Sequence, residues 1–587
     1  MTSFMDALDN HTATSNKLGE NGHTEYDWSH NFQERICQFH FQLVRTNQMT
    51  VLSNILRGLL RTLFDNKPKG PIGSGCVNEF LCVLYCMLAQ TRDIIDGKGE
   101  YELSYMMLLV WYEFFPTLAL YALESFVHSP IDIQTKVVAV DFHPYGSWKD
   151  MKYFANYCKS NGCSDDHPFI KRIIYLTNTQ LYFDENAMNS GLPSSKLSLA
   201  AKWIPRQSST QFGWLNKLLA MDYHREIMSS VMGAPLSGQY KSAQTKCIML
   251  YRKLLSKLNS QLDTIQIKQC AHNWASIDHA KTTSITFMKQ SKALYNVDKN
   301  GKQRSSEYDR KQCAEQLKEF VDERVKSGNE IKGGRVGMAD FTKKAMELIS
   351  RQRNSRHDVS CLSEIALLNS QWRDSSALTG PLSNFVAMVD TSASMTWEGG
   401  DPYNVAVSLG IRVAEKSALG KRVMTFSNNP TWVRLSGEYI DMVEQISKSD
   451  AGMGTDFYKA LDLILQACCE NNVLAEVVAK MVLVIFSDMQ ISEGDSGYKS
   501  MYAGIVLKYR DAGYNQPPHI LFWNLRSTGG FPTLMREPNV STMSGFSPAL
   551  LNTFCEKGVE GLASANPWDS LVVSLYKERY SQMMTQI

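Results

Sequence analysis

The chain has 587 residues, of which 44% are hydrophobic and 20% charged, the balance of a globular protein with enough apolar side chains for more than one core. The count of 61 Lys and Arg residues against 59 Asp and Glu residues excludes nucleic-acid binding through overall charge, so such a partner would need a local basic surface. Thirteen dispersed cysteines without a CxxC pair favour a reducing, cytoplasmic setting over a secreted scaffold, and they offer no evident structural zinc site.

The N-terminal half is dominated by helical patterns. Residues 1–27 are polar and lack the apolar core of a signal peptide, so we interpret them as a flexible arm. From about Trp28 to about Leu368, apolar residues recur at intervals of three and four, as in 78–94, 240–262 and 306–328, with short polar connectors between them. This pattern predicts an all-helical, HEAT-like module over 28–379, although no clean repeat period is visible.

The most apolar segment runs from Leu103 to Val127. It contains Glu113, Pro116 and Glu124, and the two carboxylates would be costly inside a lipid bilayer. We therefore expect two buried helices interrupted near Pro116 rather than a membrane span, and no membrane partner.

Strand patterns appear after residues 374–384. Short β-rich runs alternate with helical segments, which is typical of a parallel sheet covered by helices on both faces. The strand-like runs are 385–390, 421–426, 480–488 and 519–525, and the intervening helical segments include 404–418 and 456–469. The sequence thus predicts a doubly wound, Rossmann-like α/β domain over 380–587.

Oxygen-bearing side chains follow the ends of the predicted strands. Asp390, Ser392 and Ser394 come just after the first strand, Thr455 precedes a helix, and Asp488 ends a central strand. Ligands of such sheets bind at the carboxyl ends of the strands, and this oxygen set suits Mg²⁺ or Mn²⁺. The alternative is that these residues are helix caps, turn residues and a strand-end residue, and the neighbouring Asp456 could also be a helix cap.

The motif "DTSAS" at 390–394 matches the DxSxS pattern of the von Willebrand factor A family, and the segment 380–587 resembles that family throughout. The resemblance implies a metal-ion-dependent adhesion site, in which Asp390, Ser392 and Ser394 hold the ion directly or through water. Thr455 and Asp488 would complete this site. Members use the ion to grip an acidic side chain of a protein partner, so the site does not imply catalysis.

Two segments of the helical part carry a second resemblance. In "QTRDIIDGKGE", Gly97 and Gly99 permit a tight connection, and Lys98 could contact phosphate or lie in a solvated turn. Residues 145–158 predict a turn followed by a helix that buries Trp148 and Tyr153.

Together these segments resemble an uncharacterised DUF family of eukaryotes and giant DNA viruses, in which a TROVE-like helical module precedes a von Willebrand A domain. The runs 198–206, 267–284 and 332–341 fit the same pattern. The Ro autoantigen proteins are similar in architecture. That similarity implies a helical ring closed by the A domain and structured RNA as a partner.

A run of basic residues before the α/β domain could follow a phosphate backbone. The candidates for RNA contact are Lys332, Arg335, Lys343, Lys344, Arg351, Arg353 and Arg356. A weaker basic group comprises Lys196, Lys202 and Arg206. The alternative interpretation of both groups is a solvated helix face.

Catalytic motifs such as GxSxG, a Walker loop and HExxH do not occur in the sequence, and His272 and His279 are interpreted as packing or turn residues. We expect a non-catalytic binding or scaffold protein, whose A domain binds a protein partner through a divalent ion and whose helical module binds RNA or protein. The alternatives are a ribonucleoprotein component with a structural or vestigial metal site, and a packaged virion component.

Overall fold

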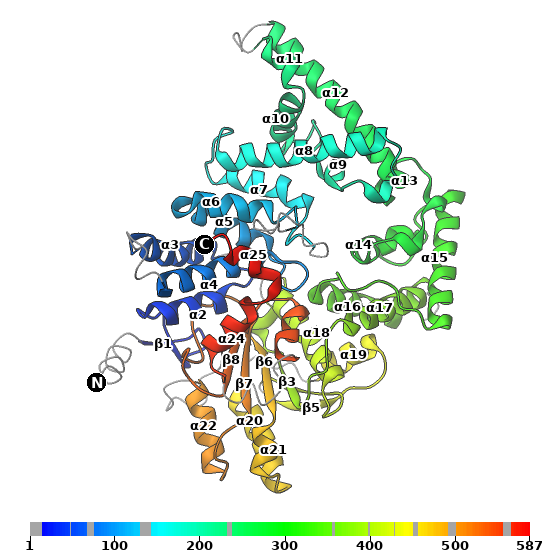
Figure 1. The fold of residues 1–587 in the computed structure, drawn as a ribbon. Helices are drawn as coiled ribbons and strands as arrows, with labels where there is room; N and C mark the ends of the chain where they lie inside the picture. The colour runs from blue at the N-terminus through cyan, green and yellow to red at the C-terminus, as the bar shows by residue number, and fades with distance from the viewer. Residues whose placement is uncertain are drawn as a thin grey trace.

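The computed structural model describes residues 15–46, 48–66, 75–129, 143–231, 238–354, 359–396, 399–427, 429–449, 456–490, 501–555 and 565–587. A six-stranded sheet lies in the lower half of the molecule, and the helices that precede it in the chain rise above it and return to it (Figure 1). Thr455 and Arg356, both predicted site residues, lie outside the described residues.

The sheet is parallel apart from one edge strand. Its order is β5-β4-β3-β6-β7-β8, and β5 pairs antiparallel with β4. In chain order the strands are β3 (Phe385–Asp390), β4 (Arg422–Phe426), β5 (Thr431–Arg434), β6 (Val482–Ser487), β7 (His519–Asn524) and β8 (Val540–Ser544). The four predicted strands are thus confirmed as β3, β4, β6 and β7, whereas the two edge strands were not predicted.

Both faces of the sheet are covered, as the apolar strands predicted. Successive side chains of a strand point to opposite faces, and in β3 Ala387 and Val389 join one core while Val386 and Met388 join another. The helices associated with the sheet are α18 (Asp401–Lys416), α19 (Tyr439–Lys448), α20 (Phe457–Glu470), α21 (Ala475–Ala479) and α22 (Met501–Asp511). The first two pack on the first face and the other three on the second.

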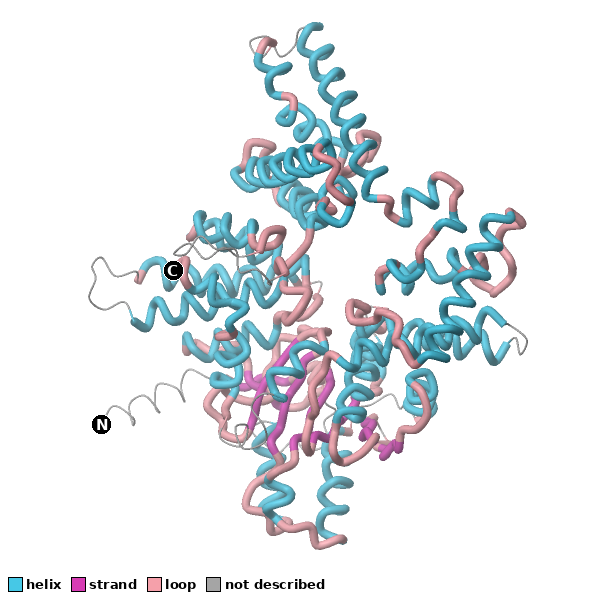
Figure 2. The backbone as a smooth tube through the Cα atoms, turned by 45° about the vertical axis from the view of Figure 1, so that its right-hand side comes forward, coloured by secondary structure: helices cyan, strands magenta, loops and turns pink. Residues whose placement is uncertain are grey.

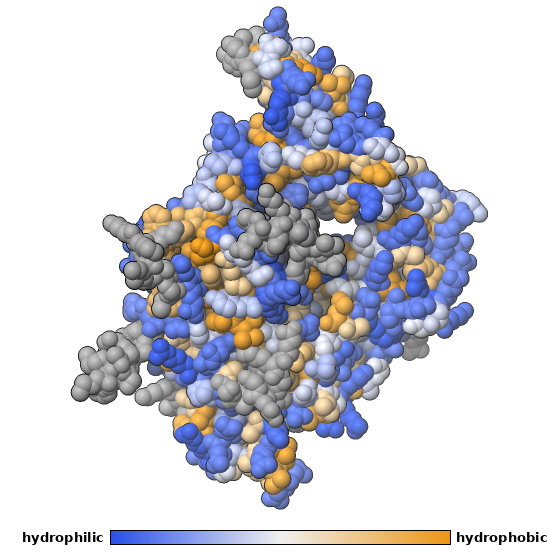
Figure 3. Space-filling view, in the orientation of Figure 1, coloured by the Kyte–Doolittle hydropathy of each residue, from blue (hydrophilic) through white to orange (hydrophobic). Residues whose placement is uncertain are grey.

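The helical module forms an arc that starts and ends at the sheet domain (Figures 1 and 2). Its helices are α2 (Phe32–Gln42), α3 (Met49–Asp65), α4 (Gly75–Arg92), α5 (Tyr101–Phe114), α6 (Pro116–Glu124), α7 (Trp148–Ser160), α8 (Pro168–Asn189), α9 (Ala200–Trp203), α10 (Gly213–Tyr223), α11 (Arg225–Ser229), α12 (Gly238–Leu262), α13 (Ile265–Cys270), α14 (Ser284–Leu294), α15 (Tyr308–Ser327), α16 (Met338–Asn354) and α17 (Val359–Ala377). At one end α2 packs beside β8, and at the other α16 and α17 pack on α18 and α19. Seen in space-filling form, the molecule has an opening inside this arc (Figure 3).

The predicted interruption of the apolar segment is confirmed. Helix α5 ends at Phe114 and α6 begins at Pro116, which occupies the first helical turn, where its missing N–H costs nothing. Among the described helices, none is both long and apolar enough to cross a membrane.

The C-terminal segment, which the sequence assigned to the sheet domain, packs both on β8 and into the helical module. It contains α24 (Pro567–Leu575) and α25 (Ser581–Met584), joined by a 3₁₀ turn, η6 (Glu578–Tyr580). Leu571, Leu575, Tyr580 and Met583 are buried in the main core of the helical module. The sequence boundary near Gly380 therefore separates two chain regions, but the packed cores do not follow it.

The N-terminal region also differs from expectation. Within the predicted flexible arm, residues 16–26 form an antiparallel hairpin of β1 (Asn16–Leu18) and β2 (Thr24–Tyr26). Tyr26 exchanges backbone hydrogen bonds with Phe531 of the sheet domain, at 3.0 and 3.1 Å. Polar composition suggested an arm, but these backbone and side-chain contacts order the hairpin.

Candidate functional site

The predicted oxygen ligands of the first and third loops come together at the carboxyl ends of β3 and β6. These strands are parallel neighbours, with Val389 opposite Phe486, so Asp390 and Asp488 leave the sheet at the same edge. Both aspartates are fully buried, and Ser392 is nearly so. We call Asp390, Ser392, Ser394 and Asp488 the strand-end cluster.

Hydrogen bonds join the members of the strand-end cluster. The Ser392 N–H donates to Asp390 Oδ1 at 2.9 Å, and the Ser392 and Ser394 hydroxyl oxygens lie 3.0 Å apart. Ser394 also hydrogen-bonds to the Asp488 carboxylate. The alternate spacing of DxSxS thus directs three side chains toward one point, as the sequence predicted.

Two residues that the sequence did not single out complete the surroundings. Ser487 donates its hydroxyl to Asp390 Oδ2 at 2.6 Å, and Arg526 Nε donates to Asp488 Oδ2 at 3.0 Å. Arg526 lies just beyond β7, the strand adjacent to β6. A search of the residues that follow each predicted strand would have found Arg526, because this residue comes directly after the fourth predicted strand.

The two carboxylates have different electrostatic surroundings. Burial and the nearby charge of Asp488 raise the pKa of Asp390 to about 7, although its serine donors oppose the shift. Burial also raises the pKa of Asp488, and the Arg526 guanidinium opposes this. Asp488 is therefore ion-paired, whereas Asp390 accepts its hydrogen bonds from the neutral donors Ser392 and Ser487.

The chemistry of this donor set fits a hard divalent cation. Two carboxylates and two serine hydroxyls lie within one hydrogen-bonded group, and a cation beside Asp390 would offset a buried negative charge. Among the described residues, no group of three or more His, Cys, Asp or Glu side chains is arranged to hold a metal. This cluster would therefore depend on its hydroxyls and on ligands from elsewhere.

The sequence suggested the role of Asp456 but not the unusual backbone of Met489. Asp456 caps α20 by accepting the Lys459 N–H at 3.0 Å, which is the capping role considered for it. Met489, directly after Asp488, has a φ of 62°, a left-handed backbone that non-glycine residues rarely adopt. Such strained residues are concentrated at functional sites.

The basic run before the sheet domain is largely engaged in ion pairs. Lys344 and Arg351 are buried and bind opposite oxygens of the Glu364 carboxylate, at 2.6 and 2.7 Å. On the surface, Lys343 pairs with Asp401 and Arg353 with Glu444. Arg335 donates to the Ile94 carbonyl at 2.8 Å, and Lys332 to the Ala280 carbonyl at 3.3 Å. These contacts give the run a structural role within the protein.

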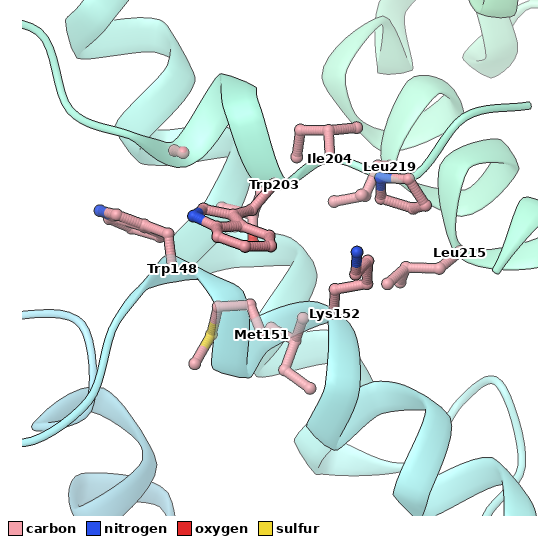
Figure 4. A pocket seen from close by; sticks show the side chains of 11 residues that line it. Trp148, Met151, Lys152, Trp203, Ile204, Leu215 and Leu219 are labelled. Carbon is pink, nitrogen blue, oxygen red and sulfur yellow. The ribbon is translucent and has the colours of Figure 1, made fainter. Parts of the chain in front are cut away.

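A different basic surface lies on α7 and α9, where lysines sit over aromatic rings. The Lys149 ammonium lies 5.0 Å from the ring centre of Tyr153, and that of Lys152 lies 5.3 Å from Trp203 and 5.0 Å from Phe212. Lys202, from the weaker predicted group, lies 5.9 Å from Trp203. Lys152 and Trp203 line one small pocket, in which Leu215 and Leu219 form the apolar wall (Figure 4).

This lysine–aromatic face comprises Lys149 and Lys152 of α7 and Lys202 and Trp203 of α9. Burial lowers the pKa of each of its lysines, and for Lys149 the charge of Lys289 on α14 adds to this. Helices α7 and α14 lie on either side of the opening (Figures 1 and 3). Within the described part of the chain, none of the three lysines has a carboxylate at ion-pair distance, unlike Lys159, which pairs with Asp165.

Comparison with known proteins adds three findings. Residues 384–580 match the family model described as a domain of unknown function, DUF7788. An uncharacterised protein, L728, of Acanthamoeba polyphaga mimivirus is 27% identical over 491 residues, which cover 81% of this chain and 76% of that protein. The crystal structure of the Deinococcus radiodurans Ro (RSR) protein aligns over 93% of this chain and 99% of that chain, with 10% identity and a TM-score of 0.33.

Proposed function

We propose that this chain is a non-catalytic scaffold that binds single-stranded RNA on its lysine–aromatic face. The observation that supports the proposal is the set of three lysines that lie over aromatic rings without carboxylate partners among the described residues. Proteins that bind single strands combine cationic side chains for the backbone with aromatic planes on which bases stack.

The electrostatics of the face favour an anion. Partial burial lowers the pKa of Lys149, Lys152 and Lys202 because the charged ammonium loses water. A phosphate oxygen would restore a favourable partner and form charge-assisted hydrogen bonds with these groups. The half-buried indole of Trp203 offers a stacking surface beside them.

The test is a salt titration of binding to a labelled oligouridine. Replacing Lys149, Lys152 and Lys202 together by Gln should weaken binding. It should also make the plot of log affinity against log salt less steep, with a slope smaller in magnitude by about 2, because each single-strand phosphate contact contributes about 0.7. The matched control replaces Lys343 and Arg353, which are exposed but already paired. An unchanged slope in the triple variant, or an equal change in the control, would contradict the proposal.

A second proposal concerns the strand-end cluster. We propose that it binds Mg²⁺ or Mn²⁺, with Asp390, Ser392, Ser394, Thr455 and Asp488 as the ligands implied by the resemblance to von Willebrand A domains, and that the ion engages an acidic residue of a protein partner. The supporting observation is that buried Asp390 accepts its hydrogen bonds from neutral donors. A bound divalent ion would supply the positive charge that this carboxylate lacks.

A further inference from the structure

The turn of the N-terminal hairpin lies against the strand-end cluster. Glu20 stands at the tip of the hairpin, between Gly19 and Gly22, whose backbones close the turn through a 3.0 Å hydrogen bond. Its backbone N–H donates to the side chain of Gln490, and the Asn21 amide donates to the Gln490 carbonyl at 3.0 Å. Gln490 follows Asp488 by two residues, so the hairpin tip is bound to the third loop of the cluster.

Arg526 connects the hairpin to the cluster. Its Nε donates to Asp488 Oδ2 at 3.0 Å, and its Nη2 donates to Glu20 Oε2 at 2.7 Å. A planar guanidinium offers donors along more than one edge, so it can hold two carboxylates at once. Here one carboxylate is buried in the sheet domain and the other arrives from a segment more than 500 residues earlier in the chain.

The two ends of the hairpin are held with different strength. Its base is fixed by the backbone pair between Tyr26 and Phe531 and by the edge-on contact of Trp28 with the Phe531 ring. At the tip, the Glu20 side chain is 46% exposed, whereas the Arg526 side chain is only 9% exposed. Because the Glu20 carboxylate is open to solvent, water can replace its contact with Arg526, and the tip can be released while the base stays docked.

We infer that Arg526 is the centre of a carboxylate-binding site, which Glu20 occupies within the same chain. An acidic side chain of a protein partner binds there by displacing the hairpin tip and takes over the Arg526 and Gln490 contacts. The inference rests on the strand-end cluster of the second proposal, but it requires no metal ion. It is independent of RNA binding.

The first measurement is hydrogen–deuterium exchange of residues 15–27 in the full chain, in the presence of a chelator. Glu20→Gln removes the charge of the tip contact, and Arg526→Lys keeps a cation for Asp488 but loses the forked geometry. Both should raise exchange at the hairpin tip by roughly 2- to 5-fold, the effect of losing an ion pair that is open to solvent on its Glu20 side. Glu476→Gln, at an exposed carboxylate of the same domain, should leave it unchanged. Unaltered exchange in Glu20→Gln would overturn the inference.

The second measurement uses a labelled peptide with the sequence of residues 16–26, also in chelator. The Glu20→Gln chain should bind this peptide about tenfold more tightly than a peptide with Gln at position 20, because a charged acceptor forms the stronger hydrogen bonds. The wild-type chain should bind it more weakly, because its own Glu20 competes. Equal affinity for both peptides would overturn the inference, and this outcome would be distinct from a failure of divalent-ion binding.

Discussion

Asp390 shows what a single residue contributes to the candidate metal site. Its carboxylate is fully buried at the end of a central strand and lies beside a second carboxylate, and its donors are the Ser392 N–H and the Ser487 hydroxyl. A buried charge with neutral donors is costly for the folded protein, so binding of a cation would stabilise this state.

The substitution Asp390→Asn separates ion binding from folding. An amide oxygen can still accept from Ser392, but the charge is gone, so affinity for Mn²⁺ measured by calorimetry should fall by about tenfold or more, since even indirect partners of metal ligands have effects of that size. In chelator the variant should unfold at the same temperature as the wild type or higher. Asp462→Asn, at an exposed carboxylate paired with Lys508, serves as the control. Undiminished Mn²⁺ affinity in Asp390→Asn would exclude this site.

Among the connecting elements, the turn from Gln90 to Glu100 shows how a short segment joins two parts of the molecule. The sequence suggested that Lys98 contacts phosphate or lies in a solvated turn, but the structure buries it. Its ammonium donates to the carbonyls of His40 and Leu43 and to the Ser544 hydroxyl, at 3.0, 2.9 and 2.6 Å. The turn thereby joins the end of α2 to the end of β8, which explains why a lysine occupies it.

Gly97 is required for this turn by close backbone approach. A Cβ at this position would lie 2.1 Å from the Gln90 carbonyl oxygen, so Gly97→Ala should lower the free energy of unfolding by about 2 kcal/mol, as overpacking does. Gly58, in the interior of α3, has open space around it, and Gly58→Ala should raise the free energy of unfolding by up to about 1 kcal/mol. Urea unfolding of the two variants checks both signs, and equal effects would refute this account of the turn.

At the scale of the whole molecule, the C-terminal segment fastens the helical module to the sheet domain. Arg579 binds Asp93 through two hydrogen bonds of 2.5 and 2.6 Å, and the Tyr580 hydroxyl donates to the same carboxylate at 3.0 Å. The same segment packs on β8 through α24, so the arc of helices is held to the sheet domain at both of its ends, by this segment and by α16 and α17.

Breaking this buried pair should destabilise the whole chain. Arg579→Gln leaves Asp93 buried without its cation, which typically costs about 3–5 kcal/mol. Arg57→Gln breaks a similarly forked pair with Glu113 on the surface, and it should cost less than about 1 kcal/mol. Thermal unfolding of Arg579→Gln should show a single transition at a lower temperature than in the wild type, and this temperature should be the same in the circular-dichroism signals of the helices and of the aromatic side chains. Two separated transitions in the wild type would show that the cores unfold independently.

The sequence by itself determined the features that depend on local pattern. Apolar runs predicted four strands of the sheet, Pro116 predicted the interruption between α5 and α6, and the DxSxS spacing brought Asp390, Ser392 and Ser394 together. These succeed because side-chain period and strand-end position are properties of a few consecutive residues. The edge strands were missed because β5 and β8 have weaker apolar patterns than the central strands.

Only the tertiary structure decided which charges meet. Arg526 lies between Asp488 and Glu20, and Lys344 and Arg351 share Glu364, which removes them from the surface that their run suggested. It also brought the C-terminal helices into the helical core and ordered the hairpin of residues 16–26. Charge pairing and core membership depend on contacts between distant segments, and one sequence carries no local signal for them.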